Sequence, residues 1–215
     1  MSPTPPPTPA EREAWLAWKT RTFGDGYHIW HEGLDLAAVT RLRGDARAAA
    51  LAMLRRGLAL GDPHAARALA ALDDPADRPA VRAHLERSSG AELAWLVATM
   101  HERRREPALA RRIFTVLQTI DPQDTTGSDR LAAAIVLRHF GGPESGPEVE
   151  AALLGALTDP AYLVRYHASE SLLALWRVNP PTIADHPAIF AELRDDTGDP
   201  ARARTLLLAL TARAP

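Results

Sequence analysis

Apolar residues recur at helical spacing along most of the chain, and short polar breaks separate the segments that carry this pattern. The clearest segment follows an Asp-Pro step at Asp159, where Val164, Ala168 and Leu172 would fall on one face of a helix. The side chain of an Asp in this position caps the first backbone N–H groups, and Pro is tolerated in the first helical turn. We therefore expect a helix over 160–177 with one buried stripe.

The same pattern predicts further helices, arranged in pairs. Breaks rich in Gly, Pro and Asp punctuate the sequence between them, and such residues end helices or start turns. The expected pairs are 45–60 with 63–72, 76–87 with 90–105, 107–120 with 128–140, 146–158 with 160–177, and 186–196 with 199–213. Ala, Leu and Arg dominate the composition, which suits helices better than strands. The fold class predicted is all-α.

The N-terminal region departs from this pairing. Residues 1–8 are rich in Pro and are expected to form a disordered tail, because Pro lacks the backbone donor. Thr8 and Glu11 have the spacing of a capping box, which would open a helix that continues to about Phe23. We interpret the aromatic segment 27–33 as a loop or short turn.

A further helix is expected before the paired region begins. It would span roughly 34–43, ahead of the Gly-Asp break that opens the first pair. The predicted organisation is a tail over 1–8, an N-terminal helical cap over 9–43, and a repeat array over 44–215 that forms one domain with the cap.

The segment after Asp159 resembles the second helix of a HEAT repeat. It carries an Asp in the inter-helix turn, a Val-Arg pair that ends at Arg165, and then an Ala- and Leu-rich helix. Weaker copies begin at Asp62 and Asp199, and the pairs at 76–105 and 107–140 lack the motif. The Asp-Pro steps at Asp121, Asp159 and Asp199 recur about 40 residues apart, close to the HEAT period. The resemblance implies an α-α superhelix, a HEAT-like solenoid of about five helix pairs with an N-terminal helical cap.

The same resemblance assigns structural roles to several charged residues. In HEAT repeats the turn Asp and the downstream Arg form a polar ladder within and between repeats. The residues that would form this ladder here are Asp62 and Arg67, Asp159 and Arg165, and Asp199 and Arg204.

Composition and charge narrow the function classes. The chain has 215 residues, no Cys and a formal net charge of −2, so disulfides, thiolate nucleophiles and Cys-based zinc sites are excluded. Lys19 is the only lysine, and the near-neutral charge disfavours a general nucleic-acid binder. The N-terminus is neither a signal peptide nor a membrane segment, so we expect a cytoplasmic protein without membrane association.

Enzyme signatures do not emerge from the sequence. There is no Gly-rich phosphate loop and no Gly-x-Ser-x-Gly motif, so we nominate no catalytic residue and no cofactor. His28 and His31, with Glu32 and Asp35, have a spacing that could gather a metal. Loose spacings of this kind are mostly accidental, so we expect these residues to have surface or capping roles and expect no metal site.

Two groups of residues are candidates for binding. The first is an arginine corner, which comprises Arg103, Arg104, Arg105, Arg111 and Arg112. We interpret this corner mainly as a solvated helix end, with an acidic protein partner or a nucleic acid as alternatives.

The second group is expected on the second helices, which line the concave face in HEAT-like solenoids, and comprises Tyr162, Tyr166, Glu170, Arg138 and Trp95. Aromatic side chains beside charges are typical of interface centres, although Trp95 could equally fill the core between repeats.

These features favour a non-catalytic protein-binding solenoid. The chain looks similar to bacterial HEAT-like immunity or adaptor proteins that sit beside secreted toxins, which implies that its partner is another protein, such as a cognate toxin. The alternatives are a HEAT-like alkylpurine DNA glycosylase, which would require Asp159 near Tyr162 and Trp176 to act in catalysis, or a tetrapyrrole lyase-like HEAT protein. The sequence leaves the oligomeric state open.

Overall fold

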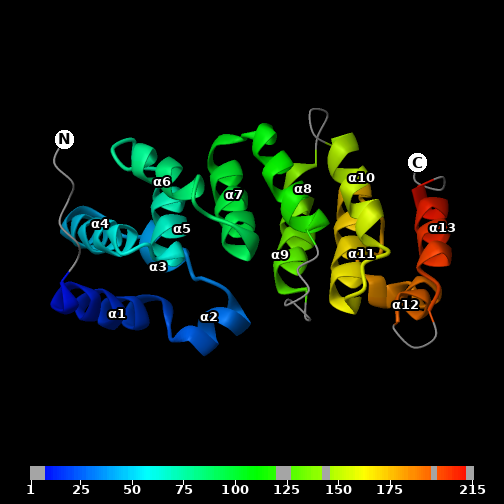
Figure 1. Cartoon of the computed structure of the whole chain (residues 1–215), viewed down its shortest axis with the longest axis horizontal. Helices are drawn as coiled ribbons and strands as arrows, with labels where there is room; N and C mark the ends of the chain where they lie inside the picture. Colours follow the sequence, from blue (N-terminus) through cyan, green and yellow to red (C-terminus); the bar gives the residue numbers. More distant parts are fainter. Residues whose placement is uncertain (1–7, 120–126, 142–145, 195–197, 212–215) are drawn as a thin grey trace. The chain divides into compact units, whose positions relative to one another are not determined.

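The computed structural model describes residues 8–119, 127–141, 146–194 and 198–211. Within these residues all regular structure is helical, with thirteen α-helices, three 3-10 helices and no strand (Figure 1). The all-α fold class predicted from the hydrophobic pattern is therefore confirmed.

The chain divides into two compact units, residues 1–88 and residues 89–215. The first unit holds α1 to α6, and the second holds α7 to α13. The expectation that 44–215 forms a single repeat array stays a prediction.

In the first unit, α1 packs on α4, and α4 in turn packs on α5. Trp15 of α1 is almost fully buried, and the small residues of α5 allow neighbouring helices to approach closely. The six helices of this unit are α1 (Pro9–Phe23), α2 (Gly26–Glu32), α3 (Ala37–Thr40), α4 (Gly44–Ala59), α5 (Pro63–Leu72) and α6 (Arg78–Leu85).

The start of α1 confirms the predicted capping box. Thr8 Oγ1 accepts a hydrogen bond from the Glu11 backbone N–H at 3.3 Å, and the Glu11 carboxylate accepts one from the Thr8 backbone N–H at 2.8 Å. The predicted loop over 27–33 is wrong, because these residues lie mostly within α2. Asp25 caps this helix, because its carboxylate accepts a hydrogen bond from the His28 backbone N–H at 2.8 Å.

In the second unit, helices lie in two layers. α7, α9 and α11 are consecutive neighbours in one layer, while α8 and α10 contact each other and pack against α9 and α11 in the other (Figure 1). The elements are α7 (Gly90–Arg104), η1 (Pro107–Leu109), α8 (Ala110–Gln118), α9 (Ser128–Val136), η2 (Leu137–Phe140), α10 (Gly146–Ala156), α11 (Tyr162–Trp176), η3 (Ile183–Asp185), α12 (Pro187–Leu193) and α13 (Pro200–Thr211). The helices predicted for the paired region match these elements and α4 to α6 apart from shifts at their ends, but the expected pair 76–87 with 90–105 is divided between the two units.

The core of this unit combines aliphatic stripes with runs of alanine. Ala132, Ala133 and Ala134 of α9 are all buried, as are Ala168 and Leu172 of α11. Alanines permit close helix contact at no cost in side-chain entropy, so α9 can contact both α7 and α11.

The helix expected from Pro160 begins at Tyr162 instead. Asp159 does cap a backbone group, but the group is the N–H of Ala161, at 2.8 Å from Asp159 Oδ1, and this residue lies outside the helix. The Asp159 carboxylate is also held by Arg130, a cation on another helix that the local Asp-Pro motif does not reveal.

Candidate partner-binding site

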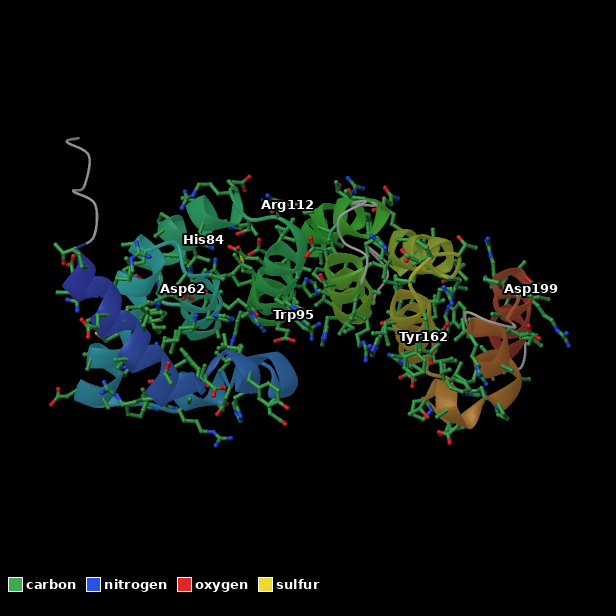
Figure 2. All side chains as sticks on the ribbon, turned by 60° about the horizontal axis from the view of Figure 1, so that its bottom comes forward. Asp62, His84, Trp95, Arg112, Tyr162 and Asp199 are labelled. Carbon is green, nitrogen blue, oxygen red and sulfur yellow. The ribbon has the colours of Figure 1, made fainter. Side chains whose placement is uncertain are left out.

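Three aromatic rings gather where α11 meets α12. Tyr162 and Tyr166 lie one turn apart on α11 with ring centroids 6.0 Å apart, and the ring of Phe190 on α12 meets Tyr166 edge-on at 6.3 Å. Phe190 is 36% exposed, while the two tyrosines are half-buried. We refer to Tyr162, Tyr166 and Phe190 as the aromatic cluster, and Figure 2 labels Tyr162 within it.

Glu170 fixes the polar edge of this cluster. Its carboxylate Oε1 accepts a hydrogen bond from the backbone N–H of Ile183 at 2.7 Å and so ties η3 to α11. Burial raises the pKa of the Tyr166 hydroxyl, and the charge of Glu170 and a hydrogen bond with it raise this pKa further. Tyr166 is therefore a neutral phenol at neutral pH, held in place by its neighbours.

Arg138 reaches the same region from η2. Its Nε donates to the Ile135 carbonyl at 2.9 Å and to Ser171 Oγ of α11 at 3.2 Å. Ser171 Oγ itself donates to the Ala134 carbonyl of α9 at 2.7 Å. These bonds hold the guanidinium against α11, half-buried, so that the structure brings the predicted residue Arg138 near Glu170.

Two histidines near Arg138, His139 and His167, are not among the candidates selected from the sequence. His167 precedes Ser171 by one turn of α11, and its ring lies 5.2 Å from the ring of Tyr166. His139 follows Arg138 directly, and its Nδ1 is 3.5 Å from Glu102 Oε1 of α7. Their positions could have indicated them as candidates, because each histidine lies on the second helix of its pair, next to residues selected for the binding site.

Trp95 lies apart from these residues. It is half-buried on α7, and α9 lies between α7 and α11 in the layer (Figure 2). The structure therefore places four of the five predicted binding residues together and Trp95 on a separate helix, α7.

The predicted ladder residues make contacts of a structural kind, but with partners other than those expected. The Asp159 carboxylate pairs with Arg130 through two bonds of 2.7 and 3.2 Å, and both side chains are buried. Arg165 instead donates to the main-chain carbonyls of Asp159, Pro160 and Leu193.

The other two ladder positions are caps. Asp62 Oδ1 accepts from the backbone N–H groups of His64 and Ala65 at the start of α5, and Asp199 Oδ1 does the same for Ala201 and Arg202 at the start of α13. Arg67 is half-buried, and Arg204 is exposed.

Three of the five residues of the arginine corner are exposed to solvent. Arg103, Arg105 and Arg111 are exposed, and Arg111 forms a two-bond ion pair with Glu148 at 3.1 and 2.9 Å. Exposed pairs of this kind contribute little to stability because water and salt screen them.

Neither a metal-binding cluster nor a helix long and apolar enough to span a membrane occurs among the described residues. Among the described side chains, no group of three or more His, Asp and Glu residues is placed to hold a metal; the side chain of His31 lies outside them. No helix in the described ranges combines the length and apolar character needed to cross a membrane.

Comparisons with protein-family models, with curated proteins and with solved structures give no match to this chain.

Proposed function

We propose that this chain is a HEAT-like helical-repeat protein that binds another protein and catalyses no reaction. The observation that carries the proposal is the aromatic cluster of α11 and α12, together with Arg138, which is bonded to α11. Half-exposed Tyr and Phe rings supply contact area at a low cost in side-chain entropy, and Arg and Tyr are the residues most often found at the energetic centre of an interface.

The paired helices support the repeat assignment. α8 with α9 and α10 with α11 pack as pairs, and successive second helices are neighbours, which is the packing that a HEAT-like array requires. By analogy with immunity and adaptor proteins of similar architecture, the partner is an enzyme such as a toxin. Burial of about 1,600 Å² would suffice to cover the active site of such an enzyme.

The glycosylase alternative fits the structure less well. A catalytic Asp must reach a base that has been flipped out of the duplex. The side chain of Asp159, however, is 6% exposed and already engaged with Arg130. Neutralised by a buried cation, this carboxylate serves packing between helices better than chemistry on a nucleic acid.

The test is to capture a partner from a lysate of the source organism, purify it, and measure its affinity by calorimetry. We expect Tyr166→Ala to weaken binding at least about tenfold, because truncation of an anchor residue costs ~2 kcal/mol or more. Tyr27→Ala is the matched control, since Tyr27 is 72% exposed and lies in the other unit. Equal affinities for wild type and Tyr166→Ala would refute the proposed surface, and tight binding of duplex DNA by the wild type would favour the alternative.

A further inference from the structure

Arg138 is fixed through its Nε, while its terminal nitrogens make no hydrogen bond with the described residues. Its Nε is committed to Ile135 and Ser171, whereas its two terminal nitrogens donate to no acceptor among the described residues. The guanidinium has lost part of its water without gaining a carboxylate: burial lowers its pKa, and the charge of Glu170 opposes that effect without an ion pair. A half-buried guanidinium with an open fork is suited to bind an anion in two-bond geometry.

Two imidazoles lie near enough to Arg138 for its positive charge to act on both rings. His167 Nδ1 is buried and has no hydrogen-bond partner in the part of the chain that the structure describes. Ser171, which binds Arg138, lies four residues after His167 and so on the same face of α11. His139 adjoins Arg138 in sequence. Burial lowers the pKa of both rings, and the positive charge of Arg138 lowers each of them further, as expected for neighbouring cations.

We propose that Arg138, His139 and His167 form a receptor site for a single carboxylate of the partner protein, presented next to an apolar side chain that packs on the aromatic cluster. The proposal rests on the proposed function and names the segment that the partner contributes. Because the ring of Tyr166 lies 5.2 Å from that of His167, an acidic residue and an adjacent apolar residue can occupy the two parts together.

The flanking charges favour one carboxylate over a polyanion. Glu102 of α7 lies beside His139, and Glu170 lies near Arg138 and His167, so carboxylates stand on both sides of the site. A duplex carries a negative charge about every 1.7 Å along its axis, and its neighbouring phosphates would meet these carboxylates. A lone carboxylate avoids that repulsion and matches the planar fork of Arg138.

The site should respond to pH. The charged and titratable groups that surround the two rings are His101 and Glu102 from α7, Arg138 from η2, and Tyr166 and Glu170 from α11. A bound carboxylate favours the protonated rings, so binding takes up protons. Affinity for an acidic segment is therefore expected to rise as the pH falls from 8 to 6.

The experiment uses a display library of random heptapeptides against the intact chain. Peptides that bind wild type are synthesised in two forms, one with Glu or Asp and one with the corresponding amide, and Kd values are measured by fluorescence anisotropy. We expect enrichment of Glu or Asp beside an apolar residue. For wild type, the amide form should bind about tenfold more weakly than the acid form. For Arg138→Gln, this difference should be no more than about twofold, because the variant lacks the group that recognises the charge.

His167→Gln and Arg103→Gln complete the comparison. His167→Gln should reduce the acid-to-amide ratio and flatten the pH profile, and it provides a second test if Arg138→Gln fails to fold. Arg103→Gln, an exposed arginine on α7, should leave the ratio unchanged. Any of three results would overturn the carboxylate site. The selected peptides could show no enrichment of Glu or Asp, the acid-to-amide ratio of Kd values could be the same in Arg138→Gln, His167→Gln and wild type, or duplex DNA could displace the peptide.

The outcomes also separate this proposal from the proposed function. If Tyr166→Ala abolishes peptide binding while Arg138→Gln and His167→Gln do not change it, the protein-binding surface stands and the carboxylate site fails. If none of the three changes peptide binding, both fail.

Discussion

Asp62 and Asp159 occupy equivalent places in their motifs, yet their carboxylates have become linkers between distant elements. Asp62 Oδ2 accepts from Trp15 Nε1 at 3.0 Å and from Lys19 Nζ at 2.7 Å, which joins α5 to α1. Asp159 joins the start of α11 to Arg130 of α9. The cap at Asp62 was predictable from its own neighbourhood, but the partners of Asp62 and Asp159, which are 47 and 29 residues away along the chain, could not be deduced from either motif.

Asp62→Ala should lower the free energy of unfolding by about 2 to 4 kcal/mol, because it removes a cap and leaves Lys19 and Trp15 without their acceptor. Urea denaturation at pH 7 measures this loss. Glu13→Ala, an exposed position on α1, should change stability by no more than about 0.5 kcal/mol. Equal midpoints for Asp62→Ala and Glu13→Ala would show that this link is energetically unimportant.

The Asp62 carboxyl also makes stability depend on pH. Burial alone raises its pKa, but the interactions with His64, Lys19 and Trp15 outweigh burial and hold the pKa well below its usual range. Since the folded-state pKa lies below that of the unfolded chain, the stabilisation is present above about pH 4 and is lost as the pH falls through the folded-state value. The difference in stability between wild type and Asp62→Ala should therefore shrink in acid.

Asp159→Ala should cost about 3 to 5 kcal/mol, because the guanidinium of Arg130 would stay buried without its counter-charge. Their side chains are only 6% and 3% exposed. The double variant Arg130→Met with Asp159→Ala should recover part of this loss, since it removes the stranded charge. Denaturation midpoints of the two single variants and the double variant complete a mutant cycle; a double variant as unstable as the sum of the singles would contradict the pair.

At the scale of elements, hydrophobic spacing and Asp-Pro breaks sufficed to predict most helices. They failed at α2, where aromatic residues hid a helix that Asp25 caps, and at the start of α11, where Asp159 bonds the Ala161 N–H ahead of the helix. The candidate site was predictable only where its residues share one helix. Tyr162, Tyr166 and Glu170 share one helix, whereas the juxtaposition of Arg138 and His167 depends on packing between α9 and α11 that no local pattern encodes.

Gly44 and Gly90 offer a matched test of how helices are joined. Each opens a helix at φ +53°, but a Cβ on Gly44 would meet nothing, while one on Gly90 would collide with the Asp129 carboxylate of α9. That carboxylate accepts a hydrogen bond from the Ala91 backbone N–H at 2.8 Å.

Both Gly→Ala variants introduce backbone strain of about 1 kcal/mol. Gly90→Ala should destabilise the protein by a further ~1 to 2 kcal/mol, because it also breaks the hydrogen bond with Asp129 and displaces that side chain. Thermal melts followed by circular dichroism compare the two variants. Equal shifts in Tm would mean that the contact between Asp129 and α7 contributes nothing measurable.

At the scale of the whole molecule, the division into residues 1–88 and 89–215 predicts how far a local change spreads. Each unit has its own buried core and its own carboxylate link between helices, through Asp62 in the first and Asp159 in the second. Amide exchange in native proteins follows cooperative units of this kind, whose opening free energies can differ.

We therefore expect Asp62→Ala to accelerate amide hydrogen exchange mainly within α1, α4 and α5, and Asp159→Ala to do so mainly within α9 and α11. The physical reason is that each substitution lowers the opening free energy of the core to which its carboxylate belongs, and leaves the contacts within the other core intact. Exchange read by mass spectrometry on the full chain, under conditions where both variants stay folded, distinguishes the two patterns. If both variants accelerate exchange evenly across residues 8–211, the molecule opens as one cooperative unit and the division has no energetic counterpart.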